Sequence, residues 1–261
     1  MFTKILYINL DRRPERDDHI NNQLKKINWK GPIERVSAVD GKYLNLESVK
    51  HLIGTHALSE ALDTTPKDFA PGSYMTRGAI GCALSHRDAY INILKGNHDK
   101  VLILEDDVVL DDNFNDKLEE YMNNMPDYDV LYLGYHESKS PVPINYAVAK
   151  PNGIVFGTYG MVIDKKAVPT LLKLFPIQGQ IDSQLSYLYS SLDVYHLNSV
   201  IVHGEHSFVS NLGSDVQIIE GFNSMCGKTK SNNHFLTIIF LLFLVLGYYY
   251  LNKNVSKESL P

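Results

Sequence analysis

The sequence predicts an α/β fold with a mixed, mainly parallel sheet, and two observations support that prediction. Apolar runs without polar alternation, typical of strands buried on both faces, occur at residues 4–10, 100–104 and 129–135. Segments with helical spacing of apolar residues separate these runs, and such alternation is typical of layered α/β domains. The 261 residues suffice for one large domain or two small ones.

The first half of the chain contains three predicted strands and two predicted helices. A loop and a helix within 11–27 follow the first strand, with Pro14 in the first helical turn. A second strand within 33–41 ends in an Asp40–Gly41 turn. Residues 43–76 are expected to be irregular, and 78–94 to form a helix with one apolar face. The strand at 100–104 is expected to be central in the sheet.

The second half continues the alternation. Residues 129–135 predict a strand, and 153–164 a strand pair or one bent strand with kinks at Gly157 and Gly160. Residues 165–175 predict a helix in which Pro169 fits only in the first turns. A further helix is expected at 181–190, and late strands are expected at 193–197 and 199–203.

Charge and cysteine content exclude several classes of protein. The formal net charge is −5 and no basic tract occurs, so no nucleic-acid partner is expected. The two cysteines, Cys82 and Cys226, make no disulfide framework and suit a reducing compartment. Cys82 and His86 have the spacing of half a zinc site on a helix. No second pair at standard spacing completes it, so zinc is not expected.

The C-terminal part of the sequence predicts a membrane anchor. Residues 235–251 carry no charge, and a helix of that length spans about 25 Å, near the lower limit for a bilayer. Three tyrosines at 248–250 suit an interfacial aromatic belt. We expect a folded domain at 1–222, a polar linker at 223–234, a single-pass anchor at 235–251 and a tail at 252–261. The short tail predicts insertion after translation, with the folded domain in the cytosol.

Three consecutive acids, Glu105, Asp106 and Asp107, follow directly after a predicted strand. Ligands of α/β folds bind at the carboxyl ends of strands, and carboxylates there can hold Mg²⁺ or Mn²⁺ beside a phosphate. Strand alternation directs Glu105 and Asp107 to one face and Asp106 to the other. The alternative is a solvated strand end. The nearby Asp111 and Asp112 are expected to be ordinary turn residues.

Four segments occur in order along the chain: "YINLDRRPER", "GAIGCALSH", "LILEDDV" and "GTYGMVIDKKA". Together they resemble glycosyltransferase family 25, over about residues 4–215. The resemblance implies a GT-A-type nucleotide-binding sandwich that transfers a hexose from a UDP-sugar with inversion, assisted by Mn²⁺ or Mg²⁺. The expected hexose is galactose or glucose, and the expected acceptor is a glycan, glycoprotein or glycolipid at a membrane surface.

The resemblance also assigns roles to residues near the donor. It implies Glu105 and Asp107 as metal ligands, while Asp106 binds ribose or caps a loop. It further implies a nucleotide site lined by Asn9 and Leu10, phosphate binding or loop support by Arg13 and Arg16, and contacts to donor or acceptor from Ser85 and His86.

Two later residues complete the expected site. Asp182 in "QIDSQLS" matches the family's late Asp and is the candidate general base, with a helix N-cap as its alternative. His203 in "HGEH" is the candidate third metal ligand, with His206 as the other choice and a surface histidine as the alternative. Two other functions stay open: a metal-dependent phosphohydrolase and a non-catalytic tail-anchored adaptor.

Overall fold

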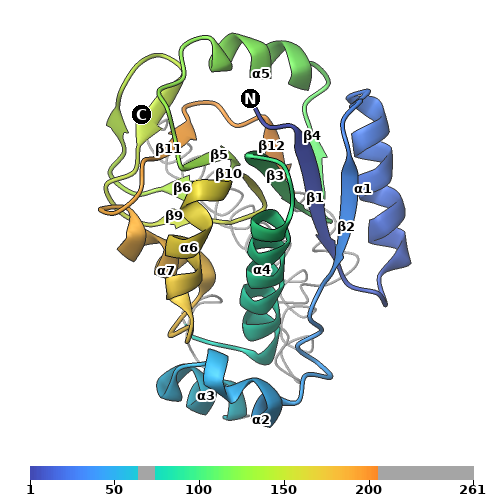
Figure 1. The fold of residues 1–261 in the computed structure, drawn as a ribbon, viewed down its shortest axis with the longest axis vertical. Helices are drawn as coiled ribbons and strands as arrows, with labels where there is room; N and C mark the ends of the chain where they lie inside the picture. The colour runs from blue at the N-terminus through green and yellow to red at the C-terminus, as the bar shows by residue number, and fades with distance from the viewer. Residues whose placement is uncertain (64–73, 205–261) are drawn as a thin grey trace, which may run out of the picture. The chain divides into compact units, whose positions relative to one another are not determined.

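The computed structural model describes residues 1–63 and 74–204, which contain the expected alternation of strands and helices (Figure 1). The predicted linker and membrane anchor at 223–251 lie outside the described residues. Within the described ranges, no helix is both long and apolar enough to cross a membrane.

The described strands build one large sheet of eight strands in the order β2-β1-β3-β10-β5-β11-β8-β7. Their bounds are β1 (Lys4–Asn9), β2 (Ile33–Ser37), β3 (Lys100–Glu105), β5 (Val130–Gly134), β7 (Val142–Pro143), β8 (Val148–Lys150), β10 (Gly160–Asp164) and β11 (Val194–Leu197). Since β8 and β10 run opposite to the other six, the sheet is mixed and mainly parallel, as predicted. β3 is central, as expected, although it pairs in parallel only with β1 and is antiparallel to β10.

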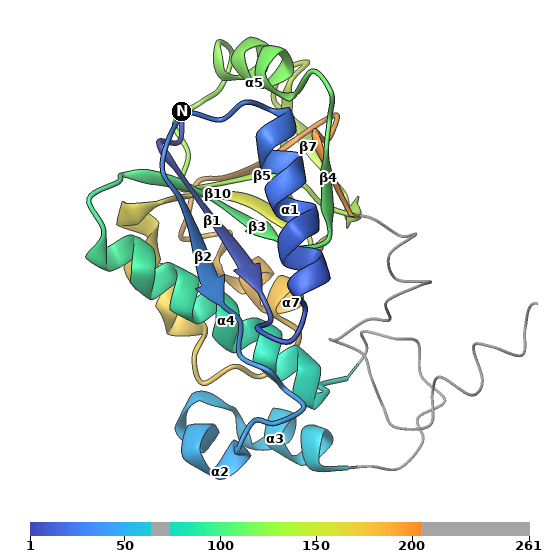
Figure 2. The ribbon, with the colours of Figure 1, turned by 90° about the vertical axis from the view of Figure 1, so that its right-hand side faces the viewer.

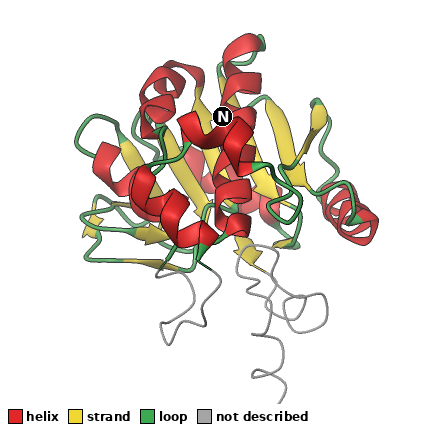
Figure 3. Ribbon diagram, turned by 90° about the horizontal axis from the view of Figure 1, so that it is seen from below, coloured by secondary structure: helices red, strands yellow, loops and turns green. Residues whose placement is uncertain are grey.

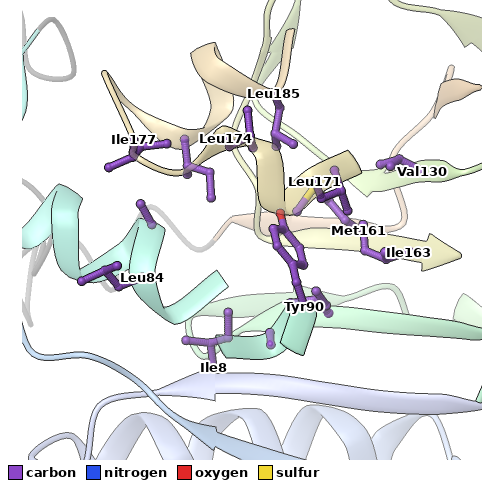
Figure 4. Close-up of a cluster of buried hydrophobic side chains, with 14 of the residues drawn as sticks. Ile8, Leu84, Tyr90, Val130, Met161, Ile163, Leu171, Leu174, Ile177 and Leu185 are labelled. Carbon is purple, nitrogen blue, oxygen red and sulfur yellow. The ribbon is translucent and has the colours of Figure 1, made fainter. Parts of the chain in front are cut away.

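Helices cover both faces of this sheet (Figures 1 and 2). One face packs against α4 (Arg77–Lys95), α6 (Val168–Leu171) and α7 (Ile181–Leu185), and the other against α1 (Pro14–Lys26) and α5 (Phe114–Met122). Strand alternation supplies both cores, because Leu6 and Ile8 of β1 join the α4 side, while Ile5 and Tyr7 join the α1 side. Figure 3 shows strands lying between helices, and Figure 4 shows part of the α4-side core.

Local sequence signals explain where the main helices begin. Pro14 opens α1, where its missing N–H costs no helical hydrogen bond. Thr76 caps α4, its hydroxyl accepting from the Ala79 backbone N–H at 2.9 Å. Pro169 lies in the first turn of α6, as its chemistry requires. A 3₁₀ turn, η2 (Lys165–Ala167), precedes α6 and another, η3 (Leu172–Leu174), follows it; η4 (Ser186–Leu188) extends α7.

The prediction of an irregular 43–76 segment is wrong for much of its described part. This part contains α2 (Leu46–Val49), η1 (Lys50–Leu52) and α3 (Thr55–Leu62). The Asn45 side chain caps α2, and Ala57 and Ala61 of α3 are buried in the α4-side core. These helices are too short for apolar periodicity to reveal them.

Two small sheets lie beside the large one. β4 (Val108–Leu110) pairs with β12 (Val202–Gly204), and β6 (Glu137–Ser138) pairs with β9 (Val155–Phe156). The segment 153–164 contains two strands, β9 and β10, as one of the two predicted alternatives required, but they lie in different sheets and do not pair with each other. Gly157 lies between the two strands with a φ of 95°, a backbone conformation that residues other than glycine rarely adopt.

Candidate active site

A cleft open to solvent lies where the carboxyl ends of β1 and β3 meet, with about 690 Å³ of empty space. The parallel register brings these ends together, because Ile8 pairs with Glu105. The walls of the cleft are formed by β1, α1, the loop after β2, α4 and the acidic triplet. Eight residues predicted for the site line this cleft: Asn9, Leu10, Arg16, Ser85, His86, Glu105, Asp106 and Asp107.

The acidic triplet divides between the two faces of the sheet. Glu105, the last residue of β3, reaches the α4 side, where its Oε1 lies 3.2 Å from His86 Nε2 and accepts from the Thr158 hydroxyl at 2.9 Å. Asp106 reaches the α1 side, where it accepts from Arg16 Nη1 at 3.1 Å and from Asn9 Nδ2 at 2.8 Å. Strand alternation therefore predicts the separation of these two carboxylates correctly.

Asp107 does not simply follow the direction of Glu105, because the strand ends at Glu105 and a turn begins. Its Oδ2 lies 3.3 Å from Arg16 Nη1, so one guanidinium nitrogen is shared between Asp106 and Asp107. A quarter of the Asp107 side chain is exposed, whereas Arg16 is buried. Among the described residues, the third acid thus shares its one cationic partner with Asp106.

The pKa values of the triplet reflect this unequal pairing. Burial raises the pKa of Glu105, but the bonds and charge of His86, the Thr158 bond and the charge of His136 outweigh it, so the net shift is downward. Burial and the charges of Glu105 and Asp106 raise the pKa of Asp107 to about 7, against the opposing charge of Arg16. Of the three carboxylates, Asp107 therefore has the least compensation from neighbouring positive charge.

Two polar residues of the cleft brace its walls. Asn9 donates to Asp106 and to the Arg13 carbonyl, while its own side-chain oxygen accepts from Arg35 at 2.9 Å. Ser85 accepts from the Val39 backbone N–H at 2.8 Å and donates to the Gly81 carbonyl at 2.7 Å. These contacts fix the loop after β2 against α4.

The two predicted arginines occupy different positions. Arg16 lines the cleft and pairs with the carboxylates of Asp106 and Asp107. Arg13 pairs with Glu15 at 3.3 Å and is not among the residues that line the cleft.

Asp182 is tied to the triplet through the Gly157–Thr158 turn. Its Oδ2 accepts from the Gly157 backbone N–H at 3.2 Å, and the next residue, Thr158, donates to Glu105. The helix cap at this position is Gln180, so the N-cap alternative for Asp182 is wrong. Asp182 lies instead in the first turn of α7, where its Oδ1 accepts from the Ser183 N–H at 2.7 Å.

The structure does not bring His203 to the acidic triplet. Its Nε2 lies 2.8 Å from Asp111 Oδ1, because the pairing of β12 with β4 places the two residues side by side. Lys117 also binds Asp111, at 2.6 Å, and the Asp111 carbonyl accepts from the Phe114 N–H at 3.2 Å, as expected for a turn residue. Among the described residues, no group of three potential metal ligands includes His203, and His206 lies outside them.

Sequence reasoning assigned no role to several residues of the site. Thr158 falls inside the quoted "GTYGMVIDKKA" segment, but the glycine kinks hide its direction. Asp40 lines the cleft and pairs with Arg12 at 2.6 Å. Cys82 also lines the cleft and lies with His86 and Glu105, whose ligand atoms are all within 4.8 Å of one another.

The oxygen donors of the triplet fit a hard divalent cation. Among the described residues, both hydrogen bonds to the Glu105 side chain fall on Oε1, which leaves Oε2 as a ligand atom, and a cation would offset the charges that raise the pKa of Asp107. Mg²⁺ and Mn²⁺ prefer such carboxylate oxygens and keep positions for substrate phosphates.

Comparisons with known proteins show the family of the chain. The model of "Glycosyltransferase family 25 (LPS biosynthesis protein)" matches residues 2–184. Human procollagen galactosyltransferase 2 is 30% identical over 200 residues, which are 72% of this chain and 30% of that protein. The rat "probable inactive glycosyltransferase 25 family member 3" is 32% identical over 139 residues, which are 51% of this chain and 23% of that protein.

The chain therefore matches less than a third of the length of these two relatives. Among solved structures, the glycosyltransferase GlyE of Streptococcus pneumoniae TIGR4 aligns with a TM-score of 0.42 at 13% identity, covering 75% of this chain and 45% of that one. The family match extends over most of the chain and contains the whole acidic triplet. The chain belongs to glycosyltransferase family 25.

Proposed function

We propose that this chain is a metal-dependent, inverting hexosyltransferase built on a GT-A-type sandwich. It transfers galactose or glucose from a UDP-sugar to a hydroxyl of a glycan, glycoprotein or glycolipid. One observation carries the proposal: an intact acidic triplet at the carboxyl edge of β1 and β3, with unbalanced charge at Asp107. The name of the human relative, a galactosyltransferase, favours galactose.

The donor side of the cleft needs carboxylates that are held in place to bind a cation. Glu105 and Asp107 would hold Mn²⁺ or Mg²⁺, which supplies positive charge to the leaving diphosphate. Arg16 and Asn9 hold the triplet from the α1 side, and His86 and Thr158 hold Glu105 from the α4 side. Such prior orientation lowers the cost of binding a charged donor.

The acceptor side needs a group that removes a proton. Asp182 takes the proton of the acceptor hydroxyl while that oxygen bonds to the anomeric carbon and the bond to the diphosphate breaks. Backbone N–H groups of Gly157 and Ser183 fix the carboxylate, and Oδ2 keeps a free lone pair for the proton. The hydrogen bonds of Gly157 to Asp182 and of Thr158 to Glu105 support this assignment.

We also propose that residues 235–251 anchor the chain in a membrane, with the folded domain in the cytosol beside its acceptor. The uncharged apolar run supports this proposal. Fractionation of the full chain and of a chain ending at residue 222 tests it. Only the full chain should sediment with membranes and resist salt extraction, and equal behaviour of the two would refute the anchor.

The enzymatic proposal is tested by UDP release from UDP-galactose and UDP-glucose with Mn²⁺, Mg²⁺ or chelator. We expect metal-dependent release that rises with acceptor, is lost in Asp107→Asn, and is kept in Asp112→Asn, which changes an exposed acid. Two curated relatives are named inactive, so binding of UDP without turnover would favour a non-catalytic member. If neither binding nor turnover occurs with any of these metals, the proposal is wrong.

A further inference from the structure

Three side chains on the α4 side of the cleft form a compact group of mixed donors. Cys82 and His86 are four residues apart on α4, and Glu105 reaches them from the end of β3. Their ligand atoms all lie within 4.8 Å of one another, and His86 Nε2 lies 3.2 Å from Glu105 Oε1. The sequence contains no second Cys–His pair at standard spacing. The third donor is Glu105 of a strand, and sequence spacing does not reveal a ligand that comes from a separate element.

His86 faces Glu105 through Nε2, and the other nitrogen of its ring is Nδ1. The side chain is 1% exposed, and its Nδ1 has no hydrogen-bond partner among the described residues. Buried polar atoms without a partner are rare, and an ion or an ordered water is a common explanation. Cys82 lines the open cleft, so an ion can reach the group from solvent.

The donor types select a class of cation. Thiolate sulfur and imidazole nitrogen suit Zn²⁺ and similar thiophilic ions, whereas Mn²⁺ and Mg²⁺ prefer oxygen. Tetrahedral zinc sites hold their ligand atoms about 3.5 Å apart, so the group needs to contract by only about an ångström. Burial, and then the charges of Glu105, Asp182 and Asp107, raise the pKa of the Cys82 thiol, and the same three carboxylates attract a cation.

We propose that Cys82, His86 and Glu105 bind one thiophilic divalent cation, such as Zn²⁺, with water or a substrate oxygen as the fourth ligand. On binding, the Cys82 thiol releases its proton to solvent and the sulfur bonds to the ion. This site differs from the proposed Mn²⁺ site in its sulfur and nitrogen donors.

The two cation sites share Glu105, which has a functional consequence. When Glu105 binds an ion together with Cys82 and His86, it can no longer bind the ion held by Asp107. Zinc should therefore inhibit metal-dependent transfer. This second part rests on the proposed function, whereas cation binding by Cys82 does not.

Cobalt binding to the full, metal-free chain tests the site directly, because cobalt–thiolate bonds give a charge-transfer absorption band. Wild type and Cys226→Ser should both develop the band and saturate at one equivalent of Co²⁺. Cys82→Ser and Cys82→Ala should both lose it. His86→Gln should weaken binding more than about tenfold, since even outer-shell changes cost that much.

Absence of the band in wild type, or its persistence in either Cys82 variant, would overturn the proposal. Circular dichroism and thermal melting without metal identify variants that fail to fold, and two substitutions at Cys82 give independent chances of a folded protein. Inhibition is measured as the Zn²⁺ sensitivity of UDP release, each variant relative to its own activity. A cobalt band without transfer would refute the enzymatic function alone, and transfer without a band would refute the cation site alone.

Discussion

Replacing Asp107 by Asn should stabilise the metal-free protein, although it removes a residue of the proposed site. The carboxyl has its pKa raised from 3.8 to about 7, so the folded state keeps a proton that the unfolded state loses. Stability therefore falls as pH rises from about 4 to about 7 and then levels off. Three pKa units correspond to about 4 kcal/mol, which is the gain expected from Asn above pH 7.

Urea unfolding at pH 5 and pH 8 measures this effect. The gain from Asp107→Asn should be about 3 kcal/mol larger at pH 8, because about two of the pH units between the two conditions lie below the folded-state pKa of about 7, where the effect grows. Mn²⁺ should stabilise wild type and not the variant, since a ligand stabilises only the state that binds it. Asp112→Asn is the matched control, with a side chain that is 93% exposed, and should change stability by less than about 1 kcal/mol at either pH.

The opposite result would be decisive. If Asp107→Asn loses stability at pH 8, Arg16 balances the carboxylate fully, and the case for a cation at this position fails. If Mn²⁺ still stabilises the variant, the ion binds elsewhere.

Three other changes probe the support of the site. Gly157→Ala should lower the free energy of unfolding, measured in urea, by more than about 1 kcal/mol. The φ of Gly157 is 95°, and the new Cβ would lie 2.8 Å from a ring atom of Tyr159. Gly96→Ala, at a position with a negative φ, is the milder control. Arg16→Met should destabilise by about 3–5 kcal/mol, more at pH 8 than at pH 5, because it leaves two carboxylates without their cation; equal loss at both pH values would refute an electrostatic cause. Asp182→Asn should lower kcat by about 10²–10⁴-fold with UDP affinity unchanged, as expected for a base; weaker UDP binding, measured by calorimetry, would assign the residue to the donor instead.

Local patterns predicted the parts of the fold that are buried and regular. The strand before Glu105 is apolar throughout and ends in acids, so its burial and the position of its carboxyl end follow from the sequence alone. Alternation then separated Glu105 from Asp106 correctly. It failed at Asp107, because the strand ends at Glu105 and the alternation does not continue to Asp107.

Pairing between distant segments could not be predicted. His203 lies beside Asp111 only because β12 pairs with β4, and no local pattern specifies that register. The meeting of Cys82 with Glu105 likewise depends on how α4 packs over β3. The short helices near Ala57 contain too few turns for periodicity to distinguish them from a loop.

The Gly157–Thr158 turn joins the two halves of the proposed reaction. Its first residue binds Asp182 and its second binds Glu105, so two adjacent residues connect the proposed base with a proposed metal ligand. Consecutive Cα atoms are 3.8 Å apart, and this span is fixed by covalent geometry. The turn therefore limits how far apart the carboxylates of Asp182 and Glu105 can lie. Changing the acceptor by engineering should succeed more readily in loops outside this turn, because lengthening it would move both carboxylates at once.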